Sequence, residues 1–506
     1  MDTECLKVLA SPRQTRRCAR RWRAPNENTV RAIILLLVVL VASCATNPVT
    51  GQREFTLMSE SQEIAMGRES DAQVRAEMGV YNDPELAKYV SDIGLRLAKR
   101  SERPTLPWQF TVVDQPAINA FALPGGFIYI TRGILPFLND EAELVGVLGH
   151  EIGHVTARHS ARQYTRTVGG VAALGALGVF VPAARPFGQI SEQALGLLFL
   201  RYGREDELQA DQLGARYAAS GGWDPAGVPG MLSTLGRLDE ASGDRKGIPN
   251  WLSTHPEPLA RVAEIKPTVA KLSAGRSDFL TNRDALERRI DGVIFGDNPE
   301  QGVIRGSAFL HPPLRFRIDF PAKWQIANSP QQVVAKAPDA DEFMLLQGVT
   351  KPQGQTARDV ATAHMQAAGF QALSGDRTTI NGLDAFVGVY QGKVEGLGEV
   401  RSRAAHIAHG GTYYLVAGLV APAGFDNVDG LFASAIRSFR PLTTAEAQAI
   451  RPSRVDFYTV RDGDSWASLA ERSGGAIRAS TLAAMNQSSA DAAPRVGARV
   501  RIVVAG

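Results

Sequence analysis

Residues 140–163 read DEAELVGVLGHEIGHVTARHSARQ, and this stretch decides how the rest of the chain is interpreted. Its apolar residues recur at the spacing of an amphipathic helix, and a polar residue at its start is typical of a helix N-terminus. We therefore predict one helix over 140–163. The helix carries the pattern H-E-x-x-H at positions 150–154.

This pattern is a candidate metal site. Residues four apart on a helix project from one face, so His150 and His154 can bind one Zn²⁺ at about 2.0–2.1 Å. Glu151 lies one step round the helix, where it can act as general base for a water that attacks a peptide carbonyl. The alternative is two structural histidines, but with only eight His in the chain a chance match is rare. His159 follows His154 by about 500° of helical turn, so we expect it to point elsewhere.

A catalytic zinc site needs a third protein ligand and an open fourth position. Glu207 and Asp211 lie four apart on a second predicted helix, at about 191–220, and therefore share one face. Glu207 can reach the metal, while Asp211 can orient a ligand histidine through its far ring nitrogen. Acidic pairs at this spacing are also common on solvated helices, so spacing alone leaves both interpretations open.

Composition is that of a globular protein. The 506 residues are 44% hydrophobic and 21% charged, which excludes wholesale disorder and predicts two to four domains. The formal charge of +3 arises at the N-terminus, because residues 1–43 hold eight Lys/Arg and three Asp/Glu. The rest of the chain has 47 basic and 49 acidic residues, a balance that does not suggest a nucleic-acid partner.

Residues 1–43 are predicted to be a signal peptide. Seven arginines precede a twelve-residue apolar run at 32–43, which is shorter than the roughly 20 residues that a spanning helix needs. The run ends in V-A-S-C at 41–44, which resembles a bacterial lipobox, and in such proteins Cys44 becomes the lipidated first residue. An ordinary cleavage site or a short anchor are the alternatives. Ala45 favours the outer membrane, so we expect a periplasmic protein held to that membrane by lipid.

Three units follow the signal segment, and the expected fold class is α+β. The first unit mixes helical patterns with short strand-like runs, including 110–113 and 127–130. The second alternates strand-like runs with helical ones at 357–368 and 427–438, and faintly resembles the Mog1/PsbP-like sandwich. The predicted boundaries are 44–290 for the first unit, 291–306 for a linker, 307–442 for the second unit, 443–455 for another linker and 456–506 for the third unit.

The third unit, residues 456–506, has the pattern strand, helix, helix, strand. This βααβ order resembles a LysM domain, a glycan-binding module of many cell-wall proteins. The resemblance implies that the unit can hold the protein to peptidoglycan. The alternative is a small structural cap.

Five motifs occur in order and resemble one family. They are T-N-P-V-T-G at 46–51, N-A-F-A-L-P-G-G at 119–126, the H-E-x-x-H helix, R-E-D-E-L-Q-A-D at 204–211 and S-T-H-P at 253–256. Together they look like the BepA-like periplasmic zinc metallopeptidases, gluzincins related to HtpX and the prenyl-protein endopeptidases. The likeness spans residues 45 to about 270. It implies one Zn²⁺ per chain with Glu207 as third ligand, and Asp211 as the partner of His150.

The resemblance assigns two further roles. The stretch that matches Asn119, Ala120 and Phe121 forms an edge strand beside the metal in that family, where a substrate peptide could pair by β-augmentation. Without the resemblance, residues 124–126 are simply a hairpin turn. The histidine that matches His255 faces the active site, as a fourth zinc ligand in a closed state or as a donor to the oxyanion. The alternative is a structural residue that caps a turn.

The sequence therefore predicts a zinc metalloendopeptidase of the bacterial envelope, with Glu151 and His255 as its catalytic residues. The family resemblance implies that its substrates are misfolded or stalled envelope and outer-membrane proteins. Two other functions stay open: a chaperone or assembly scaffold with a latent metal site, and a hydrolase of peptidoglycan peptides. A scaffold should keep much of its biological effect when Glu151 becomes Gln, whereas a protease should lose it. Cleavage of whole proteins or of purified peptidoglycan would distinguish a protease from a cell-wall hydrolase.

Overall fold

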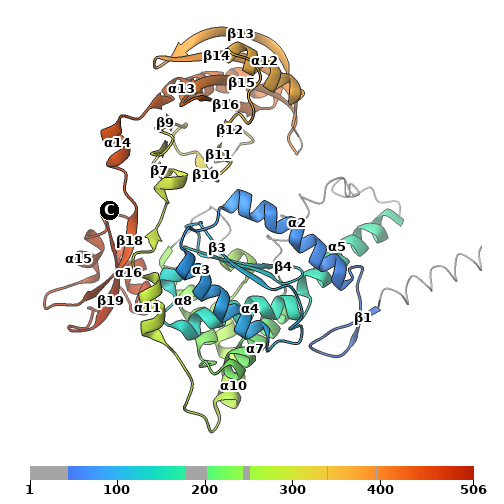
Figure 1. Cartoon of the computed structure of the whole chain (residues 1–506), viewed down its shortest axis with the longest axis vertical. Coiled ribbons are helices and arrows are strands. Elements are labelled where there is room, and N and C mark those ends of the chain that lie inside the picture. The colour runs from blue at the N-terminus through green and yellow to red at the C-terminus, as the bar shows by residue number, and fades with distance from the viewer. Residues whose placement is uncertain (1–43, 177–201, 243–250, 339, 395) are drawn as a thin grey trace, which may run out of the picture.

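The computed structural model describes residues 44–176, 202–242 and 251–506, apart from positions 339 and 395. Over these ranges the fold is α+β, as predicted. Helices surround a small sheet in the first part of the chain, and larger sheets dominate the middle part (Figure 1). The predicted signal segment 1–43 lies outside the described residues. Of the described helices, none has both the length and the apolar character needed to cross a bilayer.

The first unit packs helices around a three-stranded sheet of order β3-β5-β4. β3 and β5 are parallel, whereas β4 and β5 form an antiparallel hairpin. The turn between them contains Gly125 and Gly126 at φ 81° and 103°, a backbone conformation that favours glycine, as the hairpin prediction requires. The elements are β1 Cys44–Thr46, β2 Arg53–Phe55, α2 Glu60–Met78, α3 Pro84–Ala98, β3 Gln109–Val113, β4 Ala120–Leu123, β5 Phe127–Thr131, η1 Leu135–Phe137, α4 Glu141–Thr156, α5 His159–Ala176, α7 Arg204–Gly221, α8 Gly227–Ser242, α9 Trp251–Thr254, α10 Pro258–Ser273 and α11 Arg283–Ile290.

Helices α4 and α7 lie unusually close together. A Cβ added to Gly149 would lie 3.0 Å from the Cα of Gly214, and one added to Gly153 would lie 3.0 Å from the Cα of Ala210. Every residue of α4 is buried. The small residues therefore allow the two helix backbones to approach closely. As a result, the predicted ligands of α4 face the predicted ligand of α7.

The prediction of one helix over 140–163 is wrong at its C-terminal part. α4 ends at Thr156, and a new helix, α5, begins at His159. Between them Arg158 adopts φ 58°, a left-handed conformation that is costly for a residue with a Cβ. Its guanidinium donates at 2.6 Å to Glu63 Oε1 and at 2.6 Å to the carbonyl of Met58. These contacts to a distant segment stabilise the turn at Arg158. The periodicity of the local sequence cannot predict them.

The middle unit consists of two sheets and two principal helices. A seven-stranded antiparallel sheet has the order β10-β11-β12-β16-β15-β14-β13, and a four-stranded sheet has the order β17-β9-β8-β7. Ala404 packs with α12, whereas its neighbour Ala405 packs with α13, so the helices cover opposite faces of the larger sheet. The elements are β7 Val303–Arg305, β8 Ala308–His311, β9 Phe316–Asp319, β10 Gln325–Asn328, β11 Gln332–Lys336, β12 Phe343–Gly348, α12 Ala357–Ala367, β13 Gln371–Ile380, β14 Leu383–Val394, β15 Gly398–His409, β16 Thr412–Val420, η3 Pro422–Gly424, α13 Phe425–Ser438 and β17 Arg440–Pro441.

The segments predicted to be linkers contain regular structure. Residues 291–306 hold two strands, of which β6 pairs with the third unit and β7 with the middle unit. Residues 443–455 hold a helix and the start of a strand. Short strands escape a search for periodicity, because two or three residues give too few alternations. The elements concerned are β6 Ile294–Phe295, η2 Pro299–Gln301, β7 Val303–Arg305, α14 Thr444–Gln448 and β18 Ser453–Thr459.

The third unit has the expected strand, helix, helix, strand order and packs against the first unit. Their buried apolar residues form one continuous cluster. Gln487 Nε2 donates to Glu143 Oε1 of α4 at 3.0 Å, and buried Arg501 donates to the carbonyl of Pro136 at 2.9 Å. The third unit is thus anchored beside the N-terminal end of α4. Its elements are β18 Ser453–Thr459, α15 Trp466–Glu471, α16 Ala479–Met485 and β19 Arg499–Val504.

Candidate metal centre

Four side chains with metal-binding atoms converge in the first unit. His150 and His154 come from α4, Glu207 comes from α7, and His255 directly follows α9. One ligand atom from each lies within 4.8 Å of all the others, and all four side chains are buried. The tertiary fold therefore brings together residues that are 105 positions apart in the chain.

The spacing of these atoms fits a tetrahedral ion. His150 Nε2 lies 3.0 Å from His154 Nε2, and the two Glu207 oxygens lie 3.5 Å and 3.4 Å from these nitrogens. His255 Nδ1 lies 3.2 Å from His150 Nε2 and 3.0 Å from Glu207 Oε1. Ligands about 2.0–2.1 Å from Zn²⁺ at tetrahedral angles lie about 3.3 Å apart. Imidazole and carboxylate are also the donors that zinc accepts, so the residues fit this metal.

Burial and neighbouring charges hold His154 and Glu207 in their metal-binding forms. Burial would lower the pKa of His255, but the charges of Glu207 and Glu151 raise it above its ordinary value. Burial lowers the pKa of His154 well below its ordinary value, which keeps the imidazole neutral. Burial alone would raise the pKa of Glu207, but the charge of His255 and hydrogen bonds from His154 and His255 lower it well below its ordinary value. A neutral imidazole and an ionised carboxylate are the forms that bind zinc.

Glu151 is buried beside the four donors, with 1% of its surface exposed. Its Oε1 atom has no hydrogen-bond partner in the part of the chain that the structure describes, although His255 Nε2 lies 3.5 Å away. Burial raises the pKa of Glu151 above its ordinary value. An unpaired buried carboxylate oxygen is costly, so its position next to a metal-binding group makes Glu151 a candidate functional residue.

Asp211 lies where the sequence placed it, and a residue that the sequence analysis missed lies behind it. His150 Nδ1 is 2.9 Å from Asp211 Oδ1, which leaves Nε2 free to face the metal. Arg261 of α10, with 1% of its surface exposed, donates to both oxygens of Asp211 at 2.8 Å and 2.6 Å. It also lies 2.5 Å from Glu207 Oε2. One buried guanidinium thus orients two carboxylates, a role that a lone arginine in a helical pattern does not reveal.

His159 contacts the metal-binding group, contrary to the expectation that it points elsewhere. Its Nδ1 atom lies 2.8 Å from His154 Nδ1, and its Nε2 atom lies 2.9 Å from Gln209 Oε1 of α7. The expectation failed because it assumed an unbroken helix, whereas the chain turns at Arg158. Tyr202 adds a second support, since its ring stacks on the His154 ring with centroids 4.0 Å apart.

Replacing His159 with Ala is expected to weaken zinc binding about 10- to 100-fold, because a hydrogen bond to the far nitrogen fixes the orientation of a ligand histidine. Competition with a chromophoric chelator measures the affinity. His409→Ala is the matched control, since His409 lies in the middle unit, where its Nε2 atom is 2.9 Å from the carbonyl oxygen of Leu314. An unchanged affinity in a folded His159→Ala chain would show that His159 does not orient His154.

The predicted substrate strand occupies an edge of its sheet. β4 is the outer strand of the order β3-β5-β4, and α4 packs against it. However, Asn119, Ala120 and Phe121 are all buried, so a substrate could pair with β4 only after the atoms that cover it move. The role of this strand in substrate binding stays a prediction. So does lipidation at Cys44, which begins β1.

The donor group combines an H-E-x-x-H helix with a glutamate from a second helix. This combination is typical of gluzincin zinc metallopeptidases. Comparison with protein families agrees, because residues 84–269 match Peptidase family M48. Residues 84–269 are thus similar to an M48 peptidase domain, and their donor set is that of a zinc metalloendopeptidase.

Curated relatives carry related names. The Beta-barrel assembly-enhancing protease of Escherichia coli (strain K12) is 29% identical over 261 residues, which are 48% of this chain and 53% of that protein. The mitochondrial metalloendopeptidase OMA1 of Schizosaccharomyces pombe is 31% identical over 225 residues, 43% of this chain and 64% of that protein. The chain therefore spans about half the length of the bacterial relative. Among solved structures, cyanobacterial PsbP from Synechocystis sp. PCC 6803 matches 28% of this chain at 14% identity, with a TM-score of 0.22 that is too low to assign a fold.

Proposed function

We propose that this chain is a zinc-dependent endopeptidase of the bacterial cell envelope that hydrolyses misfolded or stalled envelope proteins, outer-membrane proteins among them. The observation that carries the proposal is the unpartnered oxygen of Glu151 beside four convergent metal-binding atoms. The names of the relatives, a protease and a metalloendopeptidase, support the reaction class. The lipobox-like sequence before Cys44 supports a periplasmic location with a lipid anchor, and the βααβ order of the third unit supports contact with peptidoglycan.

The proposed roles follow from the contacts. Zn²⁺ held by His150, His154 and Glu207 would lower the pKa of a water molecule to about 7 and polarise the scissile carbonyl. Glu151 Oε1 accepts the proton of the attacking water. Because burial raises the pKa of Glu151, the carboxylic acid then returns the proton to the nitrogen of the leaving amine.

His255 is proposed to act as a switch. Its Nδ1 atom belongs to the four-donor group, and a catalytic zinc site keeps its fourth position open. Substrate must therefore displace His255, whose imidazole could then donate a hydrogen bond to the oxygen on which negative charge develops. Trp251 stacks on the His255 ring with centroids 4.1 Å apart, so displacement of His255 would break this contact.

The same closed donor set favours a second candidate function. If His255 keeps its place permanently, the chain is a chaperone or assembly scaffold whose metal site stabilises the fold and performs no chemistry. This candidate rests on the contacts of His255 with Glu207 and His150 at 3.0 Å and 3.2 Å.

Metal removal tests the proposal on the chain from residue 44 onward. The zinc-loaded protein, at about one zinc per chain, is expected to cleave unfolded casein. Removing zinc with a chelator should stop cleavage, and adding zinc back should restore it. Zinc bound without cleavage, both in the parent and in His255→Ala, would favour the scaffold. Cleavage of purified peptidoglycan peptides but not of casein would favour a cell-wall hydrolase.

A further inference from the structure

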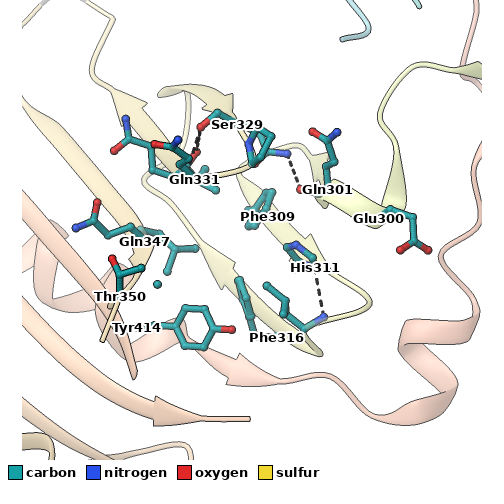
Figure 2. A pocket seen from close by; sticks show the side chains of 17 residues that line it. Glu300, Gln301, Phe309, His311, Phe316, Ser329, Gln331, Gln347, Thr350 and Tyr414 are labelled. Carbon is teal, nitrogen blue, oxygen red and sulfur yellow. Dashed lines mark hydrogen bonds between the residues drawn. The ribbon is translucent and has the colours of Figure 1, made fainter. Parts of the chain in front are cut away.

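A cavity lies in the middle unit, far along the chain from the metal ligands. Its volume is about 710 Å³, within the range of about 300–1,000 Å³ typical of ligand pockets. Strands of both sheets line it: Phe309 and His311 come from β8, Gln347 from β12 and Tyr414 from β16. Figure 2 shows Gln331 and Gln347 on one side, Gln301 on the other, and the aromatic residues between them.

The lining of the cavity is rich in amides and poor in charge. Gln301, Gln331 and Gln347 each offer both a donor and an acceptor. Among the described residues that line the cavity there is neither Lys nor Arg, and Glu300 supplies their single carboxylate. Burial lowers the pKa of His311 to about 4, so this imidazole is neutral as well. The cavity therefore suits an uncharged ligand that donates and accepts hydrogen bonds in equal measure.

An extended polypeptide fits these properties better than a sugar. Each peptide unit presents one N–H donor and one carbonyl acceptor, which is what an amide side chain pairs with. Leu314 in the lining is 45% exposed and offers apolar surface to side chains of the ligand. A sugar ring would need open aromatic faces, but Phe309 and Phe316 are only 1% and 2% exposed.

The cavity adjoins the peptidase unit. Gln301 Nε2 donates at 2.9 Å to Asp114 Oδ2, and Asp114 directly follows β3 of the three-stranded sheet. Asn328 Nδ2 donates at 2.7 Å to the carbonyl of Gln301. These three residues, Gln115 and Pro116 are among those that line a smaller cavity of about 50 Å³. The wall of the large cavity thus continues into the loop that leads to β4, the predicted substrate strand.

We propose that this cavity is an exosite, in which Gln301, Gln331 and Gln347 bind an extended, uncharged segment of the polypeptide substrate outside the metal centre. The proposal rests on the proposed peptidase function. An exosite at this place would hold an unfolded chain by its backbone, largely independent of its sequence, while another part of the same chain enters the metal centre.

The test measures binding and cleavage separately. Binding uses the Glu151→Gln chain and a fluorescent ten-residue peptide of Ser, Asn, Gln and Leu, read by anisotropy. Gln331→Ala with Gln347→Ala is expected to weaken binding about tenfold, since two hydrogen bonds are lost. The matched control is Gln353→Ala with Gln371→Ala, two exposed glutamines outside the cavity.

In the active chain, the same cavity variant should raise KM for unfolded casein about tenfold and leave kcat unchanged. It should leave the cleavage of a short peptide that reaches only the metal centre unchanged. Equal peptide affinity in the variant and the parent would overturn the exosite even if the parent cleaves casein. Displacement of the peptide by a neutral oligosaccharide such as maltoheptaose would overturn it in favour of a sugar site. Peptide binding that depends on the cavity, in a parent without any protease activity, would instead refute the proposed peptidase function.

Discussion

Replacing Glu151 with Gln is expected to lower the rate of casein hydrolysis by about 10²- to 10⁴-fold, the range that general acid–base catalysis supplies. The amide has nearly the shape of the carboxylate but cannot accept a proton. Glu151 Oε1 makes no hydrogen bond within the described ranges, and the amide fills the same space as the carboxylate, so we expect the variant to fold. The zinc content should therefore stay at about one per chain.

Hydrolysis is followed with labelled casein, and zinc is measured on the same samples by atomic absorption. Glu205→Gln is the matched control, because Glu205 is an exposed glutamate of α7, two residues before the Glu207 ligand. The control should cleave at the parent rate. If Glu151→Gln retained full activity with zinc bound, another group would have to be the base. If it lost zinc, Glu151 would be part of the metal-binding scaffold.

Replacing Arg261 with Ala is expected to lower the free energy of unfolding by about 3–5 kcal/mol, the cost of removing one partner from a buried ion pair. The guanidinium contacts Asp211 and Glu207, and none of the three side chains is more than 1% exposed. Without Arg261, both carboxylates stay buried without their positive partner. Burial disfavours the charged form of Asp211, but the charge of Arg261 and the hydrogen bonds from His150 and Arg261 together outweigh this effect and lower the pKa of Asp211.

Urea unfolding of the metal-free and zinc-loaded chains measures this loss. Arg276→Ala is the control, since Arg276 forms an ion pair with Asp278 at side-chain exposures of 41% and 71%. Exposed pairs contribute about 0–1 kcal/mol, so the control should shift stability very little. Arg261→Lys keeps the charge but not the two parallel hydrogen bonds, and an intermediate loss is expected. A loss below about 1 kcal/mol in Arg261→Ala would mean that water or another cation compensates the carboxylates.

The spacing of residues within two helices was enough to indicate candidate side chains for the metal site. His150 and His154 share a helix face whatever surrounds the helix, and the same holds for Glu207 and Asp211. The resemblance of the short motifs then joined the two helices into one ligand set, and the structure brings these four residues together. Apolar periodicity also predicted helices elsewhere, such as α12 and α13, because the residues of one helix face recur every three to four positions along the sequence.

The tertiary structure alone decided which distant groups support that site. His159 meets His154 only because contacts to Glu63 and Met58 hold Arg158 in a left-handed turn. Arg261 reaches the ligand carboxylates through the packing of α10 on α7, with no periodic signal in the sequence.

The joining of the units was decided in the same way. The third unit shares its apolar core with the first, and β6 completes the sheet of β18 and β19 across more than 150 residues of chain. The physical reason is common to all these cases. Spacing along a helix is fixed by local backbone geometry, whereas a contact between distant segments depends on how all the intervening elements pack.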